Sequence, residues 1–315
     1  MLQSLVVLKK KNKFAAIDIG SHNCRLLIVE KKDSKLRIHF NSATPTNLIK
    51  NLSFNNEFNF KNISKTVDCL KKFKKKMEYF NVSGYRCIAT EACRSVTNPE
   101  FFVHQAKVKS GIDVEIISAD EEARLSLLSC KKYTEKIKFG LLFDIGGGST
   151  ELTFFNFIDK PFSSKSCSLS FGVINLSEKN EIYGPDYNKK LIQRYVNDFY
   201  SLFKNDCTDF STIGCCSTMT TICSVYLNLP FYSPKKTEGI KMNINDVKKT
   251  IKLLKTMSTD QLRNHPCIRG KYLLLMNGIE ILSEIIEIIP TKNIIVTNKG
   301  LRDAIVDEIT IINEN

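Results

Sequence analysis

The sequence predicts an α/β protein built from two similar halves, each with a mixed β-sheet, that flank a central cleft. Three observations indicate this fold class. Strands alternate with helices along the chain, a strand–turn–strand pattern occurs twice, and 315 residues suit two domains better than three. We expect a first domain of residues 1–124 plus a C-terminal helix at about 302–315, and a second domain of residues 125–301.

The repeated pattern is the most informative feature of the chain. It runs IDIGSHNCR at 17–25 and FDIGGGSTE at 143–151, so that Asp144 follows Asp18 by 126 residues. Each copy reaches an aspartate through an apolar run, turns on glycine and small polar residues, and continues as a second apolar run. Glycine lets backbone N–H groups approach an anion, hydroxyls add donors, and the aspartate can hold a divalent cation. We expect the two copies to face each other across the cleft and to bind phosphate.

The first half shows the alternation of strands and helices. A run of lysines at 71–76 is expected on the solvated face of a helix, because Leu70, Phe73 and Met77 fall on the opposite face at helical spacing. The expected elements are strands 14–19, 25–30 and 35–40, a loop at Pro45, helix 64–80, strand 84–89, helix 99–110 ended by Gly111, strand 114–118, and a helix opening near Asp120.

The second half repeats the opening hairpin and then departs from it. We expect strands 139–144 and 151–157, a turn at Gly172, helix 188–205, strand 210–214, and a small-residue loop at 215–218 that runs into a helix. Helix 245–255, an amphipathic stretch at 279–287, strand 293–296, the turn 298–300 and helix 301–312 complete the chain.

Composition limits the classes of function. The net charge of +13 suits a polyanionic partner, but 37 of the 46 basic residues are lysine, which equally fits a compositional bias. A nucleic-acid groove is not favoured, because it would use more arginine with interleaved aromatics. No apolar run is long enough to span a membrane, and the apolar stretch 1–8 precedes its lysines, the reverse of a secretory signal. We therefore expect a cytoplasmic protein.

The eleven cysteines show no Cys-x-x-Cys pair and no zinc-like spacing with histidine. We expect them to be reduced, mostly buried, small apolar residues. None of the four histidines has neighbours that indicate a catalytic triad or a metal site.

Several charged residues could carry chemistry. Three successive acids, Asp120, Glu121 and Glu122, begin a predicted helix, where the helix dipole alone would favour them. Their place between the two repeats also allows one of them to act as a general base for water. Glu151 aligns with Arg25 in the other repeat, so the two hairpins carry opposite charges at equivalent positions.

Two further segments allow both a functional and a structural interpretation. Arg94, at the end of strand 84–89, could hold a phosphate or form an ordinary ion pair. The loop and helix start at 214–221 could bind an anion or be a capped helix without a ligand. The Gly-x-x-x-x-Gly-Lys-Ser/Thr motif is absent, so the chain is not a P-loop NTPase.

Taken together, these segments resemble the exopolyphosphatase/guanosine pentaphosphate phosphohydrolase (Ppx/GppA) family, a branch of the actin-like, sugar-kinase-like and Hsp70-like ATPase superfamily. The resemblance extends from about residue 14 to residue 306 and follows the short two-domain type. The segments in family order are 17–21 with Arg25, 89–94, 116–124, 144–151, 171–173, 214–221 and 299–302.

The resemblance implies a fold of two actin-like, ribonuclease H-like domains and a set of site residues. It places the catalytic glutamate at Glu122. It places Mg²⁺ or Mn²⁺ at Asp144 and Glu151, and Asp18 of the first repeat joins them. The implied phosphate or substrate contacts are Ser21, Asn23, Arg25, Arg94, Gly146, Gly147, Gly148, Ser149, Thr218 and Arg269.

The implied reaction is attack of water, activated by Glu122, on a terminal phosphoryl group. The implied substrates are inorganic polyphosphate and guanosine pentaphosphate, which would be converted to the tetraphosphate; a homodimer is also implied. The sequence departs from the family pattern at His22, Ser217, Lys271 and Asn298. Two alternatives therefore stay open: a low-turnover sensor that binds the alarmone or polyphosphate, and a kinase or ATPase of the same superfamily.

Overall fold

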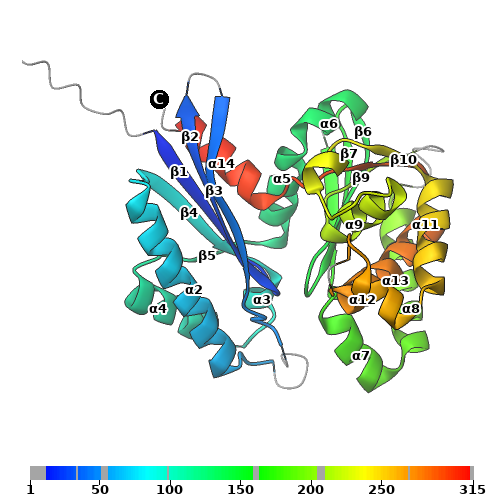
Figure 1. The fold of residues 1–315 in the computed structure, drawn as a ribbon, viewed down its shortest axis with the longest axis horizontal. Coiled ribbons are helices and arrows are strands. Elements are labelled where there is room, and N and C mark those ends of the chain that lie inside the picture. The colour runs from blue at the N-terminus through cyan, green and yellow to red at the C-terminus, as the bar shows by residue number, and fades with distance from the viewer. Residues whose placement is uncertain are drawn as a thin grey trace, which may run out of the picture.

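The computed structural model describes residues 12–32, 35–50, 56–97, 99–158, 163–203, 210–268 and 270–312. Two α/β halves lie side by side, each built around one sheet (Figure 1). The five-stranded first sheet has the order β3-β2-β1-β4-β5, and the six-stranded second sheet has the order β10-β11-β9-β6-β7-β8.

The first sheet combines an antiparallel meander with two parallel strands. Its strands are β1 (Lys13–Ile19), β2 (Asn23–Lys32), β3 (Lys35–Pro45), β4 (Gly84–Ala89) and β5 (Glu115–Ile116). Strands β1, β2 and β3 pair antiparallel, whereas β4 runs parallel to β1 and β5 parallel to β4. The helices of this half are α2 (Phe60–Tyr79), α3 (Glu91–Arg94), α4 (Pro99–Ser110) and α14 (Leu301–Ile312).

Strand β1 is covered on both faces because its alternating side chains enter two different cores. Ala15, Ile17 and Ile19 join the core beneath α2 and α4. Phe14 and Ala16 point the other way and join the core that includes α14. A strand buried on both faces consists of an almost continuous apolar run, as β1 does.

The second sheet repeats the topology of the first. Its strands are β6 (Phe139–Ile145), β7 (Thr150–Asn156), β8 (Ser163–Leu169), β9 (Phe210–Gly214), β10 (Lys241–Asn243) and β11 (Thr291–Val296). Strands β8, β7 and β6 form an antiparallel meander, and β9 and β11 extend it in parallel, so they correspond to β3, β2, β1, β4 and β5. Strand β10 adds an antiparallel edge. The predicted pair of similar halves with mixed sheets is confirmed.

The remaining helices connect the halves or cover the second sheet. They are α5 (Ala119–Ser129), α6 (Lys131–Ile137), α7 (Asn175–Tyr183), α8 (Pro185–Ser201), α9 (Ser217–Tyr226), α10 (Pro234–Thr237), α11 (Ile244–Thr256), α12 (Thr259–Asn264) and α13 (Tyr272–Ile288). The chain passes from the first half to the second through α5 and α6. It returns after β11 into α14, which packs on α5 and β1 (Figure 1). The domain boundary at residue 125 stays a prediction.

Several predicted elements differ from those observed. Helix α2 begins at Phe60 instead of residue 64, because the Asn59 side chain caps it by accepting a hydrogen bond from the Lys61 amide. Strand β3 runs through the predicted loop at Pro45. Arg94 was expected at the end of a strand and instead belongs to the short helix α3. The lysine-rich stretch behaves as predicted, with Leu70, Phe73 and Met77 buried.

Two broader expectations concern the cysteines and the membrane. The described cysteines are free thiols, and all of them except Cys167 are buried. Among the described helices, none combines the length and the apolar character required to cross a bilayer.

Candidate functional site

The two repeated hairpins superimpose in their strand register. Asp18 pairs with Arg25 across β1 and β2, and Asp144 pairs with Glu151 across β6 and β7. Each turn is closed by the same backbone hydrogen bond, from the Gly20 amide to Asn23 (3.0 Å) and from the Gly146 amide to Ser149 (2.9 Å). The Arg25 guanidinium donates to the Asp18 carboxylate at 3.0 Å, whereas the second hairpin has two acids at these positions. The alignment of opposite charges predicted from the sequence is therefore present.

The two turns touch each other, and glycine makes this contact possible. A Cβ at Gly148 would lie 2.7 Å from the Ser21 hydroxyl oxygen. A Cβ at Gly147 would lie 3.0 Å from the Ser21 Cβ and 3.1 Å from the His22 nitrogen. Side chains at these positions would force the halves apart. The structure thus brings the two predicted phosphate loops together.

Each turn is also supported by a segment that follows the third strand of its meander. After β3, the amides of Thr46 and Asn47 donate to the His22 carbonyl at 2.9 and 3.0 Å. After β8, the amides of Val173 and Ile174 donate to the carbonyls of Gly146 and Gly147 at 2.9 and 2.8 Å.

The hydrogen bonds from the 172–175 segment engage the carbonyls of the second turn but not all of its backbone amides. Asn175 donates to the Gly148 carbonyl at 2.8 Å, so the carbonyls of all three glycines are occupied. Within the described part of the chain, the amides of Gly147 and Gly148 have no acceptor. A turn with occupied carbonyls and available amides is suited to an anion. The sequence singled out the turn at Gly172 and the segment 171–173, whereas residues 46–49 and the side chain of Asn175 were not identified from it.

Glu122 lies in the first turn of α5, whose N-terminus is capped by Ser118 through a hydrogen bond from the Glu121 amide. The Glu122 side chain is 10% exposed, and its Oε2 lies 2.8 Å from an Arg94 nitrogen. This oxygen is buried and lacks a well-oriented hydrogen-bond partner within the described structure. Of the three acids that begin α5, Asp120 is exposed and Glu121 is held in other ion pairs. Glu122 is therefore the acid that faces inward.

Four carboxylates influence one another in the site. Burial raises the pKa of Glu122 to about 7, against the opposing charge of Arg94, and the carboxylates of Asp18 and Asp144 add to the shift. Burial raises the pKa of Asp144 to about 6 although Arg25 opposes it. Burial also raises the pKa of Glu151 well above its usual value, and the charges of Glu122 and Asp144 contribute. A cluster of carboxylates with shifted pKa values is typical of functional sites.

The two arginines of the site form ion pairs with acidic side chains. Arg94 contacts Glu122 and Glu91 (3.2 Å) and donates to the Ile117 carbonyl at 3.0 Å, so the ion-pair interpretation of this residue is observed. The Arg25 side chain is 42% exposed despite its contact with Asp18. Arg25 therefore has free donors for a ligand, whereas a phosphate contact by Arg94 would require it to share its donors with Glu122.

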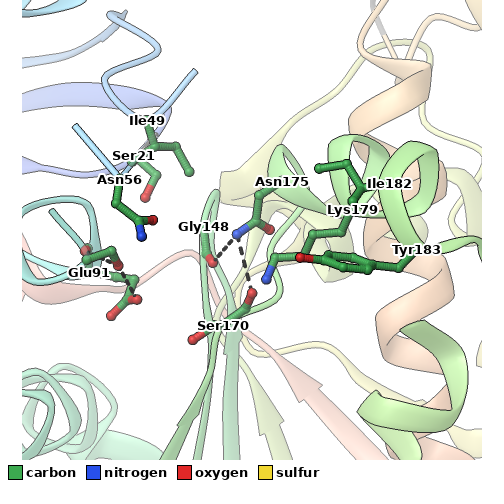
Figure 2. Close-up of a pocket in the computed structure, with 11 residues that line it drawn as sticks. Ser21, Ile49, Asn56, Glu91, Gly148, Ser170, Asn175, Lys179, Ile182 and Tyr183 are labelled. Carbon is green, nitrogen blue, oxygen red and sulfur yellow. Dashed lines mark hydrogen bonds between the residues drawn. The ribbon is translucent and has the colours of Figure 1, made fainter. Parts of the chain in front are cut away.

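A cavity of about 350 Å³ opens beside the joined turns. Figure 2 shows Ser21, Asn56 and Glu91 on one side of it and Asn175 and Lys179 on the other. Burial lowers the pKa of Lys179 while the Glu91 charge opposes this shift, and the Lys179 ammonium lies 4.8 Å from the centre of the Phe171 ring. Lys179 could not be singled out from the sequence, because α7, which carries it, buries only Leu176 and has no clear amphipathic pattern.

The other predicted contacts are placed as follows. Ser21 is buried between the turns, and Asn23 begins β2. The Ser149 hydroxyl donates to Glu151 at 2.6 Å, so this side chain orients the acid. Thr218, at the start of α9, is buried against Gly278 of α13. A phosphate contact by Thr218 stays a prediction, and Arg269 lies outside the described residues.

Two further positions singled out in the sequence are close to the first turn. His22 shares a 2.6 Å hydrogen bond with Asn47, and burial lowers its pKa, with Lys271 and Arg25 among the contributing charges. His22 is therefore mostly neutral at pH 7. Lys271 is the N-cap residue of α13 in the second half, and its positive charge helps to lower the pKa of His22 in the first turn.

The two halves share one topology and meet at their glycine-containing turns, and this arrangement defines an actin-like two-domain protein. A sequence model of the Ppx/GppA phosphatase family matches residues 27–311. The chain belongs to the Ppx/GppA phosphatase family. The resemblance and the fold expected from the sequence are both confirmed.

Solved structures and a curated relative agree with this assignment. The crystal structure of the Aquifex aeolicus member of the Ppx/GppA family is 25% identical with a TM-score of 0.78, over 96% of this chain and 99% of that one. An exopolyphosphatase from Cytophaga hutchinsonii has a TM-score of 0.82 over 95% and 98% of the two chains, and at 19% identity it shows the shared fold. A bifunctional 3-dehydroquinate synthase/phosphatase of Fusobacterium nucleatum is 29% identical over 96% of this chain, which spans about half (48%) of that relative.

Proposed function

We propose that the protein is a magnesium-dependent phosphohydrolase. It releases the terminal phosphate of inorganic polyphosphate, converts guanosine pentaphosphate to the tetraphosphate, or does both. The observation that carries the proposal is the position of Glu122: a buried carboxylate at a helix N-terminus, electrostatically coupled to the acids of both phosphate-type turns. Membership in the phosphatase family supports the same reaction class.

The two turns would bind the phosphoryl group that is transferred. The amides of Gly147 and Gly148 are available as donors, and Arg25 adds a guanidinium from the opposite hairpin. Donors fixed in this way stabilise the charge that develops on phosphoryl oxygens during phosphoryl transfer. The cavity lined by Asn56, Asn175 and Lys179 offers room for the part of the substrate beyond the turns.

Glu122 would act as the general base. Its carboxylate would accept a proton from the attacking water, and a pKa of about 7 is suited to a base that works near neutral pH. Arg94 lies 2.8 Å from one carboxylate oxygen and places a positive charge beside the base. In this proposal Arg94 stabilises the ionised form of Glu122 and contributes positive charge at the edge of the phosphate site.

The chemistry of the donor set fits a hard divalent cation. Asp18, Glu122, Asp144 and Glu151 bring four carboxylates together, and Arg25 and Arg94 form ion pairs with Asp18 and Glu122. The described residues contain no cluster of three ligands ready to enclose a metal. Mg²⁺, however, is usually held by one or two carboxylates and substrate phosphates, and keeps several waters.

Asp144 and Glu151 are the residues we propose to hold Mg²⁺ or Mn²⁺, with Asp18 opposite them. Such a cation would neutralise charge on the phosphate oxygens.

We expect a chelator to abolish phosphate release and added Mg²⁺ or Mn²⁺ to restore it. The physical reason is that the buried carboxylates would otherwise repel the polyanionic substrate. The measurement is phosphate release after treatment with EDTA and titration with each cation. Full activity in excess EDTA would remove the metal from the proposal.

We expect the rate to rise with pH through about 7 and then to level off. Glu122 must be ionised to accept a proton, and burial raises its pKa to about 7, so the base is mostly protonated at pH 5. Below this pKa, kcat/KM should fall about tenfold per pH unit. The residual activity of Glu122→Gln serves as the control, because titration of the substrate itself affects both proteins. Parallel profiles for the two proteins would contradict the assignment of the base.

Phosphate release from long-chain polyphosphate and from guanosine pentaphosphate tests the proposed function directly. Turnover of either substrate in the presence of Mg²⁺ supports the hydrolase and ranks the substrates. Tight binding of both without release would instead indicate a sensor. Consumption of ATP with an acceptor would indicate a kinase of the superfamily.

A further inference from the structure

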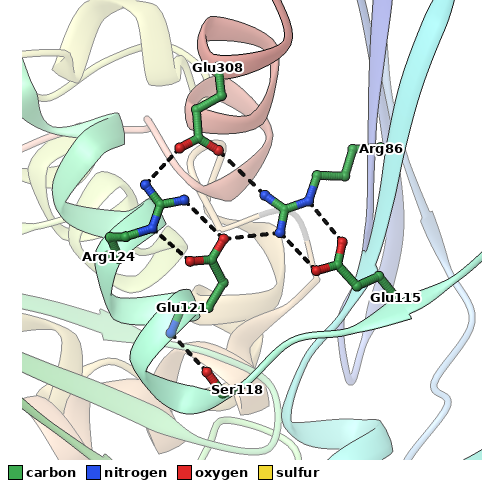
Figure 3. Close-up of polar contacts among 6 residues, drawn as sticks. All are labelled: Arg86, Glu115, Ser118, Glu121, Arg124 and Glu308. Atoms are coloured by element: carbon green, nitrogen blue, oxygen red, sulfur yellow. Dashed lines mark hydrogen bonds and ion pairs between the residues drawn. The ribbon is translucent and has the colours of Figure 1, made fainter. Parts of the chain in front are cut away.

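We propose that Arg86 is a positioning residue for hydrolysis, acting through a network of ion pairs that fixes the helix carrying Glu122. This inference rests on the proposed function. The network joins β4, β5, α5 and α14 through ion pairs (Figure 3). Its members are Arg86, Glu115, Glu121, Arg124 and Glu308.

Arg86 contacts three carboxylates at once. It donates to Glu115 through two nitrogens at 2.9 and 3.0 Å, to Glu121 at 3.0 Å, and to Glu308 at 3.4 Å. Its side chain is 24% exposed, compared with 51% for Arg124. Arg86 is thus the more buried of the two arginines and the one that reaches three other elements from β4.

The carboxylate of Glu121 accepts hydrogen bonds from two arginines, and Glu122 is the next residue in the chain. Arg124 donates to both Glu121 oxygens at 2.6 and 2.9 Å, and the Glu121 amide donates to the Ser118 cap at 3.1 Å. Successive residues of a helix point about 100° apart, so fixing Glu121 toward α14 turns Glu122 toward the site. Among the described residues, Arg94 is the one that forms an ion pair with the Glu122 side chain.

The network also links the two places where the chain crosses between the halves. Helix α5 leads from the first half to the second, and α14 follows the return from β11. Glu308 of α14 contacts Arg124 at 2.6 Å and Arg86 at 3.4 Å. Because the network joins both helices to β4, it fixes α5, and with it the base, against the sheet of the first half.

Such a network contributes more to the orientation of its side chains than to the free energy of unfolding. Partly exposed ion pairs add little to stability, whereas planar arginine pairs with two-point contacts define direction strongly. A small displacement of a catalytic group reduces turnover far more than it reduces substrate binding. We therefore expect the network to affect kcat and to leave KM nearly unchanged.

The test compares Arg86→Met with the wild type in steady-state phosphate release. We expect kcat to fall about 10- to 100-fold while KM stays within about threefold. Arg86→Lys should recover only part of the loss, because one ammonium cannot replace a planar fork that contacts three acids. The matched control is Lys107→Met, which removes an exposed ion pair with Asp113 in the same half and should leave both constants unchanged.

A second variant keeps the test decisive if Arg86→Met does not fold. Glu308→Gln removes the negative charge of this α14 side chain and one of its two acceptor oxygens, and it leaves the pairs of Arg86 with Glu115 and Glu121 in place. We expect kcat to fall again at constant KM. Where the double variant folds, its loss should be smaller than the product of the single losses, because the residues act as a unit.

An unchanged kcat in a folded Arg86→Met or Glu308→Gln protein, or a loss that appears only in KM, would overturn the inference. A wild type that releases no phosphate would reject the proposed function and this inference together. An active wild type with an unaffected Arg86→Met would reject the inference alone.

Discussion

Glu122→Gln is expected to lose hydrolysis while keeping its affinity for polyanions. The amide preserves the shape of the side chain and an oxygen for Arg94, but it cannot take a proton from water. Loss of a general base costs about 10²- to 10⁴-fold in rate. Binding should persist because the turns, Arg25 and the cavity are untouched. The measurements are phosphate release under saturating substrate and calorimetric titration with a short polyphosphate.

The matched control for this variant is Glu78→Gln, an acid of the same half whose side chain is 61% exposed and which lies outside both the site and the Arg86 network. It should keep the turnover of the wild type. Wild-type turnover by Glu122→Gln would remove this residue from the mechanism.

Gly172→Ala is expected to have the second largest effect, through packing alone. A Cβ at Gly172 would lie 2.4 Å from the carbonyl carbon and oxygen of Gly147 and 2.5 Å from the Gly148 nitrogen. These are backbone atoms that cannot rotate away, so the second turn or the 172–175 segment must move. Movement would break the hydrogen bonds from Val173 and Ile174 to the turn.

Such a displacement should reduce turnover about 100-fold and lower the free energy of unfolding by about 1–3 kcal/mol. Phosphate release and thermal unfolding measure the two effects. Gly84→Ala is the control, because the nearest atom to its Cβ would be a Phe14 ring carbon at an ordinary 3.6 Å. A Gly172→Ala protein with normal turnover and stability would show that the second turn tolerates movement.

The duplicated hairpins could be predicted from the sequence because local rules determine them. An apolar run, an aspartate and a glycine turn specify the same strand register in both copies, and Asp18 and Asp144 are observed opposite Arg25 and Glu151. The choice of Glu122 among three acids needed the resemblance, since helix dipoles favour all of them equally. The structure explains that choice by burial.

Other parts could not be predicted because their signals are weak or nonlocal. Strand β8 is rich in serine and only partly buried, so it lacks the apolar alternation of a strand, and its pairing with β7 defines it. The contact of Gly172 with Gly147 joins segments that no periodicity connects. The network around Arg86 likewise combines side chains from four separate elements.

The most direct test of the account is hydrolysis in water enriched in ¹⁸O, with guanosine pentaphosphate and polyphosphate as substrates. If water attacks the terminal phosphoryl group, mass spectrometry will find one ¹⁸O atom in the released orthophosphate and none in the shortened product. Label in the shortened product would place the attack at another phosphorus atom. Absence of release from both substrates would contradict the proposed hydrolase.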